Sequence, residues 1–112
     1  MRYDRIDIIR QDWGVGPSCT LLGVLPGKTD LLGFASTPKK AREMASKRTD
    51  VVVDYSVSND IAIGEIITGG NAVPFTALCV EGVAEISGDR FDIPKGSTIY
   101  EAVGLYCARR LA

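Results

Sequence analysis

The chain of 112 residues contains no histidine, and this absence restricts the chemistry open to it. Histidine is the commonest general base near neutral pH and, as the neutral imidazole, the commonest metal ligand in proteins. Ser-His-Asp and Cys-His catalytic arrangements are therefore excluded. An enzyme built from this sequence would have to use carboxylate, lysine, tyrosine or cysteine chemistry, and we expect no metal site.

Cysteines are few and long apolar runs are missing. Cys19, Cys79 and Cys107 are odd in number, far apart and without Cys-x-x-Cys spacing, so neither a disulfide framework nor a zinc knuckle is expected. Apolar runs such as 51–53 extend over a few residues, whereas a membrane span needs about 20. The first residues lack the continuous apolar segment of a signal peptide. These features predict a cytoplasmic protein that does not cross a membrane.

The charge of the chain is nearly balanced. Its formal net charge is −1, and 46% of its residues are hydrophobic against 24% charged. This composition is typical of a globular protein, and the length suits one domain over residues 1–112. Because no overall positive field attracts a polyanion, a dedicated DNA-binding role is not expected.

Alternation of apolar and polar residues indicates several β-strands. In the clearest, at 50–58, Val53 and Tyr55 line one face and Asp54 the other. Further strands are predicted at about 3–9, 19–25, 31–35, 61–68, 75–86 and 90–93. Gly82 is interpreted as a bulge within the strand at 75–86. Gly69, Gly70 and Asn71 predict a turn, since they tolerate left-handed backbone conformations.

Two helices are expected, at about 38–48 and about 98–109. Thr37 and Pro38 suit the cap and first position of the first helix, and Thr98 and Glu101 have the spacing of a capping box. The residues expected to face the sheet are Ala41, Met44 and Ala45 in the first helix, and Ile99, Ala102, Val103 and Tyr106 in the second.

The order of strands, helix, strands and helix predicts an α+β fold. We expect a mainly antiparallel sheet of five to seven short strands with the two helices packed against it, rather than alternating βαβ units. So small a domain would leave β edges exposed, and covering them favours a homo-oligomer.

Several carboxylates lie on or beside adjoining β segments: Asp50, Asp54, Asp60 and Glu65. Two carboxylates held close together could bind a cation or share a proton, but the same residues also serve to solubilise a surface. Asp54 is the most interesting candidate. It lies opposite the face of Tyr55 and would point into a groove if another subunit covered that side.

The first helix is basic, with Lys39, Lys40, Arg42, Lys47 and Arg48. Such a surface could contact a phosphorylated ligand, an RNA backbone or an acidic partner, or it could simply be a solvated helix face. Aromatic residues that would stack on bases are not interleaved with these cations, so the RNA interpretation lacks its second element.

The helix segment 41–45, the strand with Asp50-Val51-Val52-Val53 and the later segment 77–86 resemble the YbjQ-like family of small bacterial and archaeal proteins. In that family an amphipathic helix runs into an Ala-Asp-Val-Val strand, and a later strand ends in a Gly-x-Ala element. The resemblance implies a small α+β fold that assembles into a ring-like homo-oligomer with a binding role. It brings no catalytic residues.

We therefore expect a non-enzymatic, homo-oligomeric domain that binds a small molecule, although the sequence names neither the ligand nor a cofactor. One alternative is a small enzyme or enzyme subunit of intermediary metabolism that uses carboxylate, tyrosine or cysteine chemistry, including Cys107, in a pocket between chains. Another is phosphate or RNA contact through the basic helix. The candidate ligand-binding residues are Asp54, Tyr55, Glu65, Lys39, Lys40 and Arg42.

Overall fold

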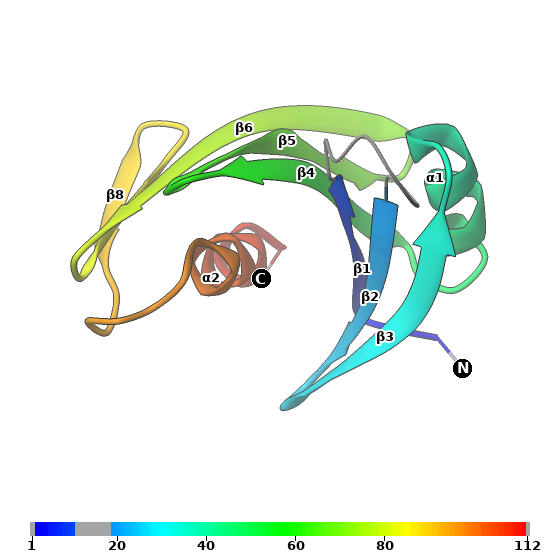
Figure 1. Cartoon of the computed structure of the whole chain (residues 1–112), viewed down its shortest axis with the longest axis horizontal. Helices are drawn as coiled ribbons and strands as arrows, with labels where there is room; N and C mark the ends of the chain where they lie inside the picture. Colours follow the sequence, from blue (N-terminus) through cyan, green and yellow to red (C-terminus); the bar gives the residue numbers. More distant parts are fainter. Residues whose placement is uncertain (1, 11–18, 112) are drawn as a thin grey trace.

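A computed structural model of the chain describes residues 2–10 and 19–111 (Figure 1). The elements along the chain are β1 (Arg5–Arg10), β2 (Cys19–Leu25), β3 (Lys28–Ala35), α1 (Pro38–Ser46), β4 (Val51–Ser58), β5 (Ile61–Thr68), β6 (Asn71–Val80), β7 (Val83–Ile86), β8 (Asp89–Asp92) and α2 (Ile99–Leu111). The structure is thus α+β, with strands as its larger part.

All eight strands form one mixed sheet in the order β3-β2-β1-β4-β5-β6-β7-β8. Neighbouring strands are antiparallel except β1 and β4, which pair in parallel from Ile6 opposite Val52 to Arg10 opposite Ser56. The hairpin of β2 and β3 extends the sheet on one side of β1. The chain then returns through α1, and β4 joins the other side of β1.

The prediction of a mainly antiparallel sheet of five to seven strands is wrong, because the sheet has eight strands and is mixed. One strand was missed because Glu81 and Gly82 do not form a bulge. Both have positive φ angles, 27° and 82°, and they make a tight turn between β6 and β7. The parallel pair was missed because alternation within a strand does not reveal which distant strand lies beside it.

The helix ends follow the predicted capping chemistry. Thr37 Oγ1 accepts a hydrogen bond from Lys40 N at 3.2 Å, and Pro38 opens α1. At α2, Glu101 N donates to Thr98 Oγ1 at 3.2 Å, while Thr98 N donates to Glu101 Oε1 at 3.2 Å. This reciprocal pair is a capping box, which satisfies backbone donors that an uncapped helix leaves unpaired.

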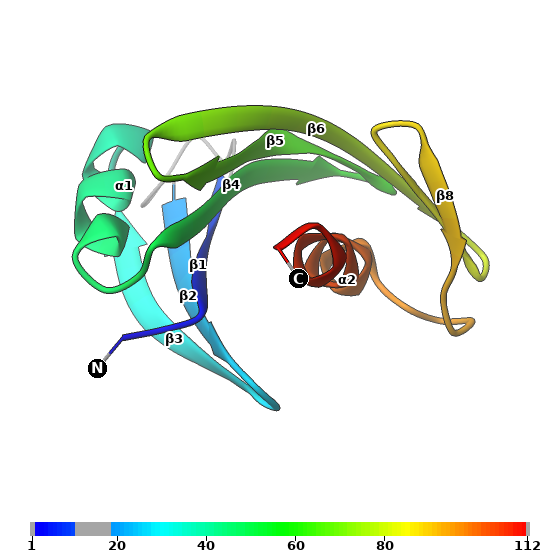
Figure 2. The same ribbon diagram turned by 180° about the vertical axis from the view of Figure 1, so that it is seen from behind.

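The sheet is strongly curved, and the helices lie on opposite faces of it (Figures 1 and 2). α2 lies inside the curve and packs on β5, β6 and β7, whereas α1 lies outside it against β1 to β4. Two separate hydrophobic cores result. Strand β4 serves both, because Val53 and Tyr55 face α2 whereas Val52 faces α1.

The helix faces agree with the sequence except at Met44. Ala41 and Ala45 are fully buried, but Met44 is 43% exposed, so its predicted place against the sheet is wrong. In α2, the predicted core residues Ile99, Ala102, Val103 and Tyr106 are all buried.

Each helix covers only part of one sheet face, and apolar side chains are exposed on the remainder. Ile61, Ile63, Leu78 and Val80 are exposed on the outer face of β5 and β6. Leu31 and Phe34 are exposed on β3, an edge strand. In the described part of the chain, neither helix combines the length and apolar character required to cross a membrane.

Candidate functional site

Asp54 lies at the centre of an ion-pair cluster beneath α1. Its side chain is fully buried, and Arg10 donates to it from Nε at 2.7 Å and from Nη2 at 2.8 Å. Arg42 of α1 adds Nε at 2.9 Å and Nη2 at 2.8 Å. Glu65 lies opposite Asp54 in the β4–β5 register and, half-buried, contributes its negative charge to the surroundings of Arg10. The helix of the same chain, not another subunit, covers Asp54.

The remaining predicted candidates are dispersed. Tyr55 projects to the opposite face of β4 from Asp54 and is buried in the core beneath α2. Lys39 and Lys40 are exposed on α1. The structure therefore brings together Asp54, Glu65 and Arg42, with Arg10 added. Phosphate or RNA contact through the basic helix stays a prediction.

A second charged pair lies on the inner face of the sheet, under α2. Arg5 Nε donates to Asp7 Oδ1 at 2.9 Å, and Arg5 Nη2 is 3.4 Å from Asp7 Oδ2. The two side chains are only 17% and 8% exposed. Arg5 approaches α2 at Gly104, where a Cβ atom would lie 3.0 Å from Arg5 Nη2. The missing side chain at Gly104 thus makes room for the guanidinium.

Arg5 opens onto a groove of about 360 Å³ between the sheet and the C-terminal half of α2. Its lining, which defines the Arg5 groove, consists of Asp4, Arg5, Val24, Leu25, Pro26, Val51, Cys107 and Ala108. The walls are mainly apolar and the guanidinium is the one cation among these lining residues. A cavity of this size with few polar groups is typical of small-molecule sites.

A contribution to stability does not by itself explain the buried Arg5–Asp7 pair. Removing two charges from water is costly, and replacing a buried ion pair by well-packed apolar residues is often neutral or stabilising. Burial indeed raises the pKa of Asp7 above its ordinary value, although the hydrogen bond and charge of Arg5 act in the opposite direction. A perturbed ionisable group beside a groove is a recognised sign of a functional site.

Cys107 and Tyr55 share this environment, and burial makes both weaker acids. Burial raises the pKa of the Cys107 thiol to about 11, with a smaller contribution of the same sign from Asp7. Burial, followed by the charge of Asp7, also raises the pKa of the Tyr55 hydroxyl. Since the thiolate is the nucleophilic form of cysteine, Cys107 is protonated and weakly reactive at neutral pH.

We expect the protein to lose stability as the pH rises from about 9 to about 11. In this window the folded state keeps the Cys107 proton, whose pKa is raised from 9.0 to about 11, while the unfolded chain releases it. The folded state therefore binds more protons, and its free energy of unfolding falls with increasing pH. Urea unfolding at a series of pH values measures this slope, which should be shallower in Cys107→Ala. Equal slopes in both proteins would contradict the assignment.

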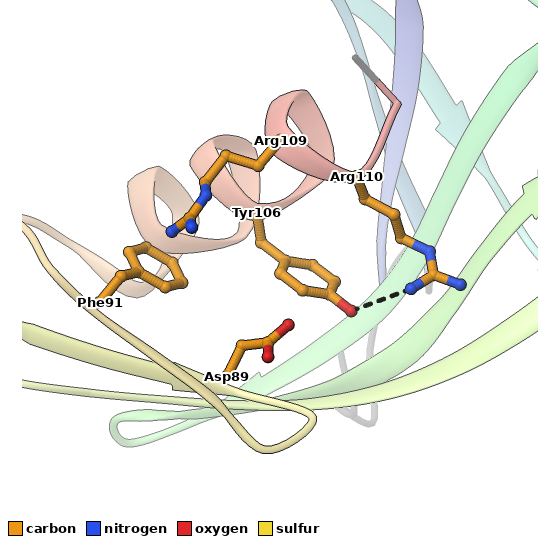
Figure 3. Close-up of a pocket in the computed structure, with 5 residues that line it drawn as sticks. All are labelled: Asp89, Phe91, Tyr106, Arg109 and Arg110. Carbon is orange, nitrogen blue, oxygen red and sulfur yellow. Dashed lines mark hydrogen bonds between the residues drawn. The ribbon is translucent and has the colours of Figure 1, made fainter.

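A third cluster lines a cavity of about 250 Å³ between β8 and α2. This β8–α2 pocket is formed by Asp89, Phe91, Tyr106, Arg109 and Arg110 (Figure 3). The Arg109 guanidinium lies 4.9 Å from the centre of the Phe91 ring, and Arg110 Nη1 donates to Tyr106 Oη at 3.4 Å. Within the described ranges, 2–10 and 19–111, no group of three or more potential metal ligands occurs.

No protein-family model, curated protein or solved structure matches the chain. The resemblance to the YbjQ-like family stays a prediction.

Arg5, Asp7 and Gly104 were not predicted as site residues from the sequence. The alternation at 3–9 contained one signal. Arg5 and Asp7 lie on the same face of the sheet as Tyr55 of the parallel neighbour β4, and that face is buried. That signal is readable only when β1 is known to lie beside β4. Gly104 carries no local signal, because its role depends on the guanidinium of a residue nearly the whole chain away.

Proposed function

We propose that the protein is a non-enzymatic, homo-oligomeric binding domain, and that its ligand is a small amphiphilic anion held in the Arg5 groove. The observation that carries this proposal is a cation in a groove whose other lining residues, apart from the exposed Asp4, are uncharged. Arg5 uses Nε and Nη2 to bind Asp7, and Nη1 donates to no group in the described part of the chain. Those N–H groups are the natural partners of a ligand carboxylate.

The groove offers contacts to both the hydrocarbon body and the anionic head of such a ligand. Val24, Leu25, Pro26 and Val51 offer apolar contact to a hydrocarbon body, and each methylene removed from water contributes about 0.8 kcal/mol. The anionic head lies against Arg5, and Asp7 holds the guanidinium in place from behind. Because that side chain is already ordered by Asp7, little of its rotamer freedom is lost on binding.

Binding is favoured over catalysis by the state of the nearby groups. A nucleophilic cysteine needs a lowered pKa, whereas burial raises the pKa of Cys107 to about 11. The alternative enzyme mechanism requires at least two of Asp54, Glu65, Tyr55 and Cys107 to converge in a pocket. Asp54 and Glu65 lie together, but on the other side of β4 and β5 from Tyr55, and both oxygens of Asp54 are bound by arginines.

Self-association is part of the proposal and has separate support. The exposed apolar residues on the outer face of β5 and β6 are of the kind found at protein interfaces. The edge strand β3 also carries unpaired backbone groups beside exposed Leu31 and Phe34. An intracellular location fits the thiols of Cys79 and Cys107, which form no disulfide in the described part of the chain, because disulfides are rare in reducing compartments.

Octanoate is a suitable probe, and we expect Gly104→Ala to weaken its binding at least about tenfold. The new methyl group would displace the Arg5 guanidinium, whose flexible end is its closest neighbour. The required shift of the guanidinium is only a few tenths of an ångström, which keeps its pair with Asp7. Alanine is also the better helix former by about 1 kcal/mol, so the variant should be no less stable. Titration followed by amide chemical shifts of groove residues measures the affinity, and thermal unfolding measures the stability.

The double variant Arg5→Met with Asp7→Leu provides the second test. It removes the ion pair as a unit, so the fold should survive while octanoate binding is lost. Leu105→Ala, an exposed position of the same helix, serves as the matched control and should bind as the parent does. Unchanged octanoate affinity in both groove variants would refute the site. Native mass spectrometry of the parent tests self-association, and a monomer at all concentrations would refute that part.

A further inference from the structure

The β8–α2 pocket is independent of the Arg5 groove because the two lie on opposite sides of α2. Successive helical residues are about 100° apart around the axis, so residues 104, 107 and 108 face one way and residues 106, 109 and 110 the other. The groove residues border β1 and β2, whereas the pocket faces β8. Ligands at the two sites would share no contact residue.

The pocket presents two arginines without carboxylate partners. No carboxylate of the described residues lies within ion-pair distance of Arg109 or Arg110. Arg109 lies over the Phe91 ring, and among the described residues its guanidinium N–H groups donate to no side chain, so they are available to a ligand. Arg110 uses Nη1 on the Tyr106 hydroxyl. Both arginines also suit the C-terminal end of a helix electrostatically, but that role does not require a shared pocket.

The positions of these groups define the shape of a ligand. Figure 3 shows the two guanidinium groups on opposite sides of the Tyr106 ring, with the Asp89 carboxylate between them at the strand side. A single small anion at one end would leave the other arginine unused. A molecule with an anionic group at each end would engage both, and Asp89 would then face its middle.

Asp89 adds a requirement of its own. A carboxylate repels a plain dianion but accepts a hydrogen bond from a hydroxyl or amino group. A ligand with such a donor between its two anionic ends would therefore satisfy all three charged side chains. Phe91 and the buried Tyr106 supply fixed walls, since Tyr106 is only 7% exposed.

We propose that the β8–α2 pocket binds a small dicarboxylate that carries a hydroxyl or amino group between its carboxylates. One carboxylate pairs with Arg109 above Phe91, and the other pairs with Arg110 beside the Tyr106 hydroxyl. The central donor bonds to Asp89. The pocket volume of about 250 Å³ restricts the ligand to a short chain.

Three probes of nearly equal size test this assignment: malate, succinate, which lacks the hydroxyl, and butyrate, which has one carboxylate. Calorimetric titration of the full chain should give the order malate, succinate, butyrate from tightest to weakest. The hydroxyl should contribute about twofold to tenfold in Kd, as expected for one hydrogen bond. Chemical shifts of the arginine Nε–H groups would place the ligand at Arg109 and Arg110.

Single-residue variants separate this pocket from general charge attraction. Arg109→Gln and Arg110→Gln should each weaken malate binding at least about tenfold, because each removes a charge-assisted pair. Arg90→Gln is the matched control. It also removes one positive charge, from β8, the strand that carries Asp89, but Arg90 and Glu85 line a different cavity. Its malate affinity should be unchanged.

Asp89→Asn tests the central contact. It should tighten succinate binding by removing repulsion and should reduce the preference for malate over succinate. The proposal is overturned if malate shows no saturable binding in the millimolar range, or if Arg90→Gln weakens binding as much as Arg109→Gln. An unchanged malate preference in Asp89→Asn would also overturn it. None of these outcomes depends on the Arg5 groove.

Discussion

Replacement of Asp54 by alanine is expected to lower the free energy of unfolding by about 3–5 kcal/mol, the usual cost of removing one partner from a buried charge pair. Asp54 is fully buried and receives hydrogen bonds from both Arg10 and Arg42. Without it, two guanidinium groups converge with no carboxylate between them. Helix α1 would lose its polar anchor to β4, since only Ala41 and Ala45 of that helix are buried.

Chemical denaturation of three variants resolves the contributions to this cluster. Arg10→Met and Arg42→Met should each cost less, about 1–3 kcal/mol, because each arginine side chain is about 40% exposed and its removal leaves Asp54 with its other partner. Asp50→Asn is the matched control, since its pair with Arg2 is exposed and such pairs contribute at most about 1 kcal/mol. A loss for Asp54→Ala no greater than that for Asp50→Asn would contradict the structural role.

Gly64→Ala should destabilise the protein by more than about 3 kcal/mol, at or beyond the usual upper range for overpacking. Gly64 lies between Tyr55 of β4 and Phe75 of β6 in the middle of the curved sheet. A Cβ atom there would lie 2.1 Å from the Asp54 carbonyl oxygen and 2.4 Å from Tyr55 Cβ. Backbone atoms on a paired strand have no room to yield, so the β4–β5 pairing itself must separate.

The comparison with Gly104 makes this prediction specific. Both glycines lie close to a neighbour, but at Gly104 the neighbour is the end of the Arg5 side chain and not backbone. The same substitution should therefore be tolerated in α2 and severe in β5. Circular dichroism and thermal unfolding of both variants, with amide spectra of the strands, would show this contrast. Equal thermal stability of the two variants would contradict it.

Local features of this protein could be predicted from its sequence for a physical reason. Helix capping at Thr37 and Thr98 depends on side chains and backbone groups within a few residues of each other. The opposite orientation of Asp54 and Tyr55 follows from the pleat of a strand, whatever lies on either side of it.

Predictions that needed long-range information were wrong or incomplete. The turn at Glu81 was missed because a non-glycine residue rarely adopts positive φ and carries little sequence signal for it. Met44 was placed in the core from helical spacing alone, but the sheet beneath α1 is filled by the smaller Ala41 and Ala45. In each case the surrounding structure determined the outcome.

By itself the sequence determined the α+β class, the two helices with their caps and the faces of the main strands, because these depend on contacts between near neighbours in the chain. Only the tertiary structure decided that β1 and β4 pair in parallel. That pairing brings Arg10 to Asp54 across 44 residues and sets Arg5 beneath Gly104 of α2. Contacts between such distant residues depend on how the whole chain closes on itself, and no local pattern specifies them.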